Sequence, residues 1–298
     1  MASFHNFFLT KPLADKFREN VSGSKDGKPD WVASIAEGED IGLFGPDSAV
    51  WQVHGCIATL VGGVRALLLQ ATHPAALTGV SEHSRYESDP LGRLAGTARW
   101  LTITTFGSTE AIAKEAARVN AMHQKVSGSF QSMIGEETNY RASDPRYLLW
   151  VHCAFTDSFL TSHLAYGYPI AKGADEYVRE WSQSAIGLGL KAAPQSVPEL
   201  KSTMESFLRE DLGARPQTEE VVKFILKPPL GKGALVFYKV LVNGAIYTLT
   251  PEQRYILGLK KVSGVWHWAC SKVLQLLSWV LGAESPSQEV ARERIARG

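Results

Sequence analysis

Apolar positions recur every three or four residues along most of this chain, which is the spacing of amphipathic α-helices. A long apolar run over residues 49–84 is interrupted at Gly62-Gly63 and again at Pro74. Glycine and proline weaken or end helices, so this run predicts two or three helices with breaks or kinks at those points. Upstream, Ser48 is a candidate N-cap, as is its neighbour Asp47.

The helical pattern continues beyond this run. It covers residues 89–107, 108–128, 144–167, 174–190, 196–213 and 217–229. Ser108 or Thr109 is expected to cap the 108–128 helix, and Gly128 is expected to end it. Residues 234–250 are β-branched and aromatic and contain Asn243-Gly244, which predicts either a hairpin or a loop-broken helix pair.

These elements predict an all-α protein with one helical domain over residues 46–285. Residues 1–45 are polar and rich in Gly, Ser and Lys in the middle, so an irregular N-terminal arm is expected there. Residues 286–298 are expected to form a solvated, charged tail.

Composition narrows the range of partners and compartments. The net charge of the 298 residues is +1, which leaves no electrostatic footprint for nucleic acid. Cys56, Cys153 and Cys270 lie far apart, which favours small buried hydrophobes in a reducing compartment. No secretory signal or membrane-spanning run is evident, so a soluble, cytoplasmic protein is expected. Residues 273–282 could lie on a bilayer surface, although a partly buried helix is the favoured interpretation.

Several enzyme signatures are missing from the sequence. None of the eight histidines lies in an HExxH motif or a di-iron ExxH pair, and there is no GxxxxGK[ST], GxGxxG or GxSxG motif. The sequence therefore gives no support to zinc hydrolase, di-iron, nucleotide-binding or serine hydrolase chemistry.

His123 is the polar residue that fits its helix least well. Ile112, Ala116 and Val119 define an apolar face that continues through position 123 to Val126. An unpartnered imidazole in a core costs about 1–3 kcal/mol, so this ring needs a partner.

Four further residues are candidate site residues. Arg93 and Thr97 lie four positions apart on one helical face, which Trp100 and Thr104 continue. His152 lies on a helix with almost no charge, where a core histidine bonded internally is the simpler interpretation. His73 directly precedes Pro74, where capping a kinked helix is the simpler interpretation.

Taken together, these residues match the needs of a b-type haem. Its iron takes a neutral imidazole nitrogen, its porphyrin takes apolar walls, and its propionates take Arg, Lys or hydroxyl partners. A non-haem iron site using His73, His83 and His123 is an alternative, but no carboxylate spacing completes a facial triad, although Glu82 or Glu87 could join it.

The blocks "GGVRALLLQATHP", "HSRYESDPLGRLAGT", "MHQKVSG" and "YRASDPRYLLWVH" resemble, in this order, the MpaB-type oxygenase family, which includes the rubber oxygenases (latex clearing proteins). The resemblance runs from about residue 51 to about residue 260. It implies a globin-like all-α protein that binds haem b, with His123 as the proximal iron ligand and Arg93 and Thr97 at the family's Arg-x-x-x-Thr pair.

The resemblance also has departures. Rubber oxygenases carry a lysine directly before that threonine, where this chain has Gly96, and their distal glutamate has no counterpart at matching spacing. We therefore expect a haem-dependent oxygenase that uses O₂ on an apolar, isoprenoid or lipid-like small molecule, with His73 or His152 as catalytic residues. The alternative is a non-catalytic helical protein that binds haem or a hydrophobic ligand.

Overall fold

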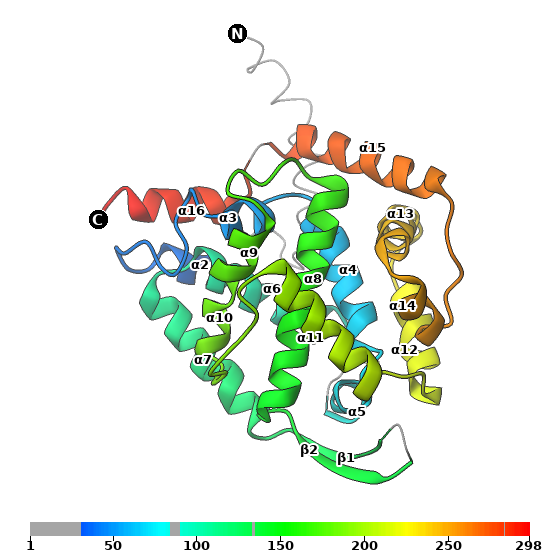
Figure 1. Ribbon diagram of the computed structural model, residues 1–298. Helices are drawn as coiled ribbons and strands as arrows, with labels where there is room; N and C mark the ends of the chain where they lie inside the picture. The colour runs from blue at the N-terminus through cyan, green and yellow to red at the C-terminus, as the bar shows by residue number, and fades with distance from the viewer. Residues whose placement is uncertain (1–30, 84–89, 133–134, 283) are drawn as a thin grey trace.

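The computed structural model describes residues 31–83, 90–132, 135–282 and 284–298, and its architecture is all-α (Figure 1). The long helix α8 (Pro145–Tyr166) runs through the centre, and α4 (Thr59–Gln70) packs along it. Asp144 caps α8 by accepting a hydrogen bond from the backbone N–H of Arg146, and the proline at the first helical position is already confined to helical φ. The predicted all-α class is confirmed.

Two apolar clusters lie on either side of α8. Trp150 and Ala154 belong to a cluster built with α4 and the later helices, whereas Cys153, Phe159 and Leu160 belong to a cluster built with the earlier helices. Because α8 supplies apolar side chains to both clusters, it is buried on most of its surface. All three cysteines are buried and free, as the sequence predicted.

The 49–84 run forms α3 (Ala49–His54), α4 and α5 (Pro74–His83). Ser48 caps α3 by accepting from the N–H of Trp51, and the break before Pro74 is confirmed. The expected break at Gly62-Gly63 is wrong, because α4 runs through both residues. Gly62 instead lies directly against Phe159, and it is the tight packing of α4 on α8 that requires a residue without a side chain there.

The next segment forms α6 (Pro90–Phe106) and α7 (Thr109–His123), followed by strands β1 (Ser127–Gln131) and β2 (Glu137–Arg141). Ser108 caps α7. The expected helix end at Gly128 is wrong: α7 ends at His123, because the following residues pair in an antiparallel ribbon with Gly128 opposite Tyr140. The ribbon packs against α5 and projects from one end of the molecule (Figure 1).

The second half of the chain continues as helices. They are α9 (Ala174–Trp181), α10 (Gln183–Ile186), α11 (Val197–Glu210), α12 (Pro216–Leu226), α13 (Lys232–Thr248), α14 (Pro251–Ile256) and α15 (Gly264–Leu281). The hairpin or broken helix pair expected over 234–250 is wrong, because α13 is one continuous helix. Gly244 packs directly against α15, where a side chain would overlap Cys270. Among the helices of the described ranges, none has the length and apolar character that a bilayer crossing requires.

The two ends of the described chain pack together. Helix α2 (Trp31–Ala36) and α16 (Pro286–Ile295) lie side by side and both contact α6 (Figure 1). The guanidinium of Arg294 is fully buried and donates to the carbonyl oxygens of Ile35 and Phe106. The expectation of a solvated tail is therefore wrong for residues 286–295, and part of the expected irregular arm is helical.

Candidate functional site

An ion pair sets the register between the two helices that carry Arg93, Thr97 and His123. Helices α6 and α7 are joined by Gly107 and Ser108 and run antiparallel. The Nε of Arg99 donates to Oε2 of the buried Glu115 at 2.8 Å, and Arg118 donates to the same carboxylate. Burial raises the pKa of Glu115, but hydrogen bonds from Arg118 and Arg99 outweigh burial, so its pKa is below the usual value. The carboxylate stays ionised and holds the helices in register.

This register brings positions 93 and 123 to the same end of the helix pair. Position 93 lies six residues beyond Arg99 along α6, and position 123 lies eight residues beyond Glu115 along α7. At 1.5 Å per residue, these offsets are about 9 and 12 Å in the same direction. Arg93, Thr97 and His123 therefore lie on two adjacent helices, toward the end of the pair that is far from the connection at residues 107–108.

His123 continues the buried face of α7, as the sequence predicted. Ile112, Ala116 and Val119 are each less than 8% exposed, and the imidazole of His123 is half-buried at the end of the helix. Its Nδ1 is buried and has no hydrogen-bond partner. Burial lowers the pKa of His123, so the ring is neutral near neutral pH and keeps the lone pair that a metal ligand needs.

The facing helix α6 presents hydroxyl and aromatic groups. Thr97 and Trp100 are half-buried, and Thr104 is fully buried with a hydroxyl that has no hydrogen-bond partner. A side-chain carbon at Gly96 would meet nothing within 4 Å, so position 96 borders open space. Arg93 lies within α6, but its side chain is outside the described residues.

His152 is near the middle of α8 and is half-buried. Its Nε2 is buried without a hydrogen-bond partner, which departs from the internally bonded core histidine that the sequence favoured. Burial lowers the pKa of His152 to about 4, so the ring is neutral at pH 7.

His73 is the N-cap of α5, the simpler of the two interpretations that its position before Pro74 allowed. Its Nδ1 accepts a hydrogen bond from the N–H of Ala75 at 3.2 Å, which assigns the ring proton to Nε2. The ring is 1% exposed and packs edge-on to Tyr147 and next to Trp150. Burial lowers its pKa to about 4.

His73 packs against one side of the central helix α8, and His152 projects from another side of the same helix. His73 packs on positions 147 and 150 of α8, which are about 60° apart around the helix axis. Position 152 is at least about 140° from each of them. The fold therefore separates the two histidines that the sequence offered together as catalytic candidates.

The three-histidine alternative is not supported among the described side chains. No group of three or more His, Cys, Asp or Glu residues that could hold a metal ion occurs there. The side chain of His83 lies outside the described residues, as do those of Glu82 and Glu87.

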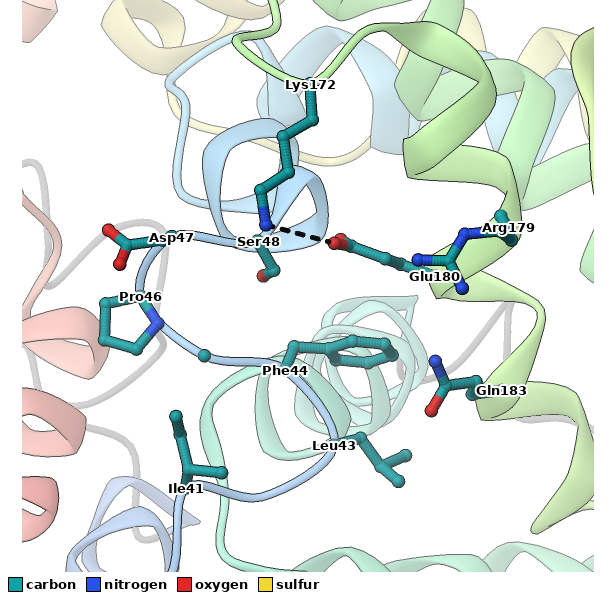
Figure 2. Close-up of a pocket in the computed structure, with 11 residues that line it drawn as sticks. Ile41, Leu43, Phe44, Pro46, Asp47, Ser48, Lys172, Arg179, Glu180 and Gln183 are labelled. Carbon is teal, nitrogen blue, oxygen red and sulfur yellow. Dashed lines mark ion pairs between the residues drawn. The ribbon is translucent and has the colours of Figure 1, made fainter.

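A separate polar groove of about 300 Å³ opens between residues 41–48 and α9 (Figure 2). The Nζ of Lys172 points toward Oε1 of Glu180 at 3.9 Å, while Oε2 of Glu180 accepts from the N–H of Val50 at 3.0 Å. Glu180 thus holds the start of α3. Of the predicted site residues whose side chains the structure describes, none lines this groove.

Comparison with protein families identifies the relatives of this chain. A family model described as the catalytic domain of ER-bound oxygenase mpaB/B' and rubber oxygenase matches residues 51–283, which is more than half of the sequence. The chain belongs to this family. No curated protein and no solved structure matches it significantly.

The mpaB/rubber oxygenase match covers every helix that carries or begins at a candidate residue, from α5 to α8. The family is one of oxygenases, which agrees with the predicted class of enzyme.

The sequence analysis did not identify Glu115, whose carboxylate sets the register between α6 and α7. Glu115 lies next to Ala116 on the apolar face of α7, and an acidic residue at a buried position is a signal that it pairs with cations.

Proposed function

We propose that this chain is a haem b-dependent oxygenase that uses O₂ on an apolar small molecule of isoprenoid or lipid-like chemistry. The observation that carries the proposal is the His123 ring: neutral, half-buried, and with a buried Nδ1 that no protein group satisfies. A structural histidine in a core is ordinarily hydrogen-bonded, whereas an iron ligand needs a free lone pair. Membership of an oxygenase family supports the same conclusion.

The residues present fit a haem. His123 would bind the iron, and Arg93 and Thr97 on the adjacent helix would hold the porphyrin edge and a propionate. Position 96 borders open space, which the side chain of the lysine found there in rubber oxygenases would occupy. When bound, the haem supplies the O₂ chemistry, and the protein supplies position, polarity and a dry surround.

His152 would act as the catalytic residue near the substrate. Its ring is neutral at pH 7 and its buried Nε2 is free to donate or accept one hydrogen bond. A neutral donor in an apolar surround orients a reacting group without attracting water or an ionic substrate. His73, the other catalytic candidate, would position α5 through its observed cap.

The test is visible absorption of the full chain expressed with added haemin. We expect a Soret band in the wild type, its loss or shift in His123→Gly, and its recovery when imidazole is supplied to the variant. His267→Ala is the matched control. The Nδ1 of His267 is also buried without a hydrogen-bond partner, but its ring stacks on Tyr247, with the centroids 4.7 Å apart.

Two results would overturn this assignment. A full, unshifted Soret band in His123→Gly would exclude His123 as the ligand. A colourless wild type that takes up no haemin would favour the non-catalytic alternative. If haem is bound, O₂ consumption with a linear isoprenoid such as squalene distinguishes an oxygenase from a carrier, and His152→Ala should lower the rate without removing the Soret band.

A further inference from the structure

Helix α15 is apolar on both of its faces, although only one of them is covered. On the inner face Cys270 and Leu274 are at most 1% exposed and pack toward α13. The outer face carries four large apolar side chains that are 59–70% exposed: Val265, Trp268, Leu276 and Trp279. In Figure 1 this helix lies along the outer edge of the molecule, beyond α13.

The exposed side chains form a continuous stripe. Positions 265, 268, 272, 276 and 279 are three or four residues apart, so they share one side of the helix. The stripe is about 21 Å long at 1.5 Å per residue. Single exposed apolar residues are normal on a soluble protein, but a stripe that includes two tryptophans marks a surface that binds something.

Positive charge surrounds this stripe. Residues 230–281 contain six lysines and arginines and a single acidic residue, although the net charge of the whole chain is only +1. Lys272 lies within the stripe, and Lys260 and Lys261 are exposed a few residues before the start of the helix. No acidic residue occurs in α15 itself. Because acidic residues are scarce here, this segment has a net charge of +5, which is six basic residues minus one acidic residue.

An anionic bilayer surface complements both the exposed apolar stripe of α15 and the positive charge near it. Tryptophan rings prefer the boundary between acyl chains and headgroups, and lysine side chains extend along an apolar surface to reach lipid phosphates. A helix with such a face lies in the plane of the interface and gains affinity from anionic lipids. Tyr255, which is 87% exposed just upstream of the lysine pair, adds a third aromatic residue suited to that boundary.

A second copy of the chain complements the stripe less well. In a two-fold symmetric dimer the same surface meets itself, so basic groups of one copy would approach those of the other. With Lys272 inside the stripe, like charges would be brought together without an acidic partner on the helix.

We propose that the outer face of α15 docks this protein onto anionic membranes, with the helix parallel to the bilayer plane. Trp268 and Trp279 would enter the headgroup region, and Lys260, Lys261 and Lys272 would contact lipid phosphates. This inference depends on the exposed surface alone and is independent of the proposed oxygenase function.

The test is co-sedimentation of the full chain with vesicles of phosphatidylcholine, alone or mixed with phosphatidylglycerol. We expect binding to the mixed vesicles that weakens at high salt, and about tenfold weaker binding by the double variant Trp268→Gln/Trp279→Gln. Lys260→Glu/Lys261→Glu should weaken binding to mixed vesicles while leaving the tryptophans in place. The matched control is Ile186→Gln on α10, because Ile186 is also 68% exposed but lies elsewhere on the surface.

Three results would overturn the proposal. These are the absence of binding to either vesicle, wild-type binding by the double tryptophan variant, and dimerisation of the lipid-free chain that the same variant abolishes. The last result would assign the stripe to a second copy of the chain. Circular dichroism and urea unfolding of each variant confirm that a loss of binding does not reflect a loss of folding.

Discussion

Gly62 on α4 lies so close to Phe159 on α8 that a methyl group at position 62 would be 2.5 Å from Cδ1 of Phe159. That distance is well inside van der Waals contact, and the Phe159 ring is itself buried, with 3% of its surface exposed. The close approach of the two central helices therefore depends on a glycine at this position. The neighbouring Gly63 differs, because a methyl group there would meet nothing within 4 Å.

The two adjacent glycines give the first prediction. Gly62→Ala should lower the free energy of unfolding by about 1–2 kcal/mol, because the overlap with Phe159 outweighs the gain in helix propensity. Gly63→Ala should raise it by about 0.5–1 kcal/mol, because only the propensity gain applies. Urea unfolding measures both changes. Effects of the same sign in the two variants would contradict the packing described here.

Glu115 gives the second prediction. Glu115→Gln should destabilise the protein by about 1–2 kcal/mol at pH 7, because two guanidinium groups lose a buried anionic acceptor while staying partly hydrated. The pKa of Glu115 is lowered by folding, so its contribution is present above the pKa of the unfolded chain and is lost as the pH falls through the folded value. The variant and the wild type should therefore converge in acid.

The control for this prediction is Glu110→Gln on the same helix. Glu110 pairs with Lys114, but both side chains are more than 60% exposed. Urea unfolding should therefore show no measurable change for Glu110→Gln. An equal loss in both variants would mean that burial of the Glu115 carboxylate is energetically irrelevant.

His54 gives the third prediction, a pH dependence of stability. The hydroxyl of Thr105 donates to the Leu101 carbonyl oxygen, so it accepts from Nδ1–H of His54, and Nε2 accepts from the hydroxyl of Tyr177. The neutral ring therefore has a partner at each nitrogen, and protonation of Nε2 would force the Tyr177 hydroxyl to reorient. Burial, with a smaller effect from His163, lowers the pKa of His54 to about 3.

The sign follows from proton binding. Below about pH 6.5 the unfolded chain binds a proton that the folded His54 does not, so stability falls as the pH falls from there toward 3. Between pH 7 and pH 5 the contribution of His54 should amount to about 2 kcal/mol. Urea unfolding at both pH values should show a smaller change for His54→Gln than for the wild type. Equal changes would contradict a lowered pKa of His54 in the folded protein.

Arg294 gives the fourth prediction. Arg294→Ala should lower the free energy of unfolding by about 3 kcal/mol, because it leaves a cavity and deprives two buried carbonyl oxygens of their donor. Thermal or urea unfolding measures the loss. Arg292→Ala, two residues earlier, should cost no more than about 1 kcal/mol, because Arg292 is 46% exposed and pairs with Glu284. Similar losses in the two variants would show that α16 is held without the buried guanidinium.

Much of the fold follows from local patterns in the sequence. Helix starts at Ser48, Ser108 and Asp144 were predictable, because a short polar side chain before an apolar run satisfies free backbone N–H groups. The errors occurred where a distant contact outweighed local preference. Residues 234–248 form a helix despite their β-branched composition, since α13 packs against both α4 and α15.

The candidate site was predictable only in part. The position of His123 on a buried face follows from its spacing from Ile112, Ala116 and Val119, and burial of those three residues confirms it. That spacing carries no information about which other groups lie nearby. The separation of His73 from His152 depends on which side of α8 the start of α5 packs against, which local periodicity does not encode.

The sequence by itself determined the all-α class, the oxygenase family, most helix starts and the inward face that carries His123. Each of these depends on residues that are close together in the chain or on short contiguous sequence motifs. Only the tertiary structure decided that Gly62 packs rather than breaks a helix, that the 286–295 segment is held by a buried guanidinium, and that α15 leaves an apolar face uncovered. Those outcomes depend on contacts between residues far apart in sequence, whose free energies outweigh local propensities of less than about 1 kcal/mol per residue.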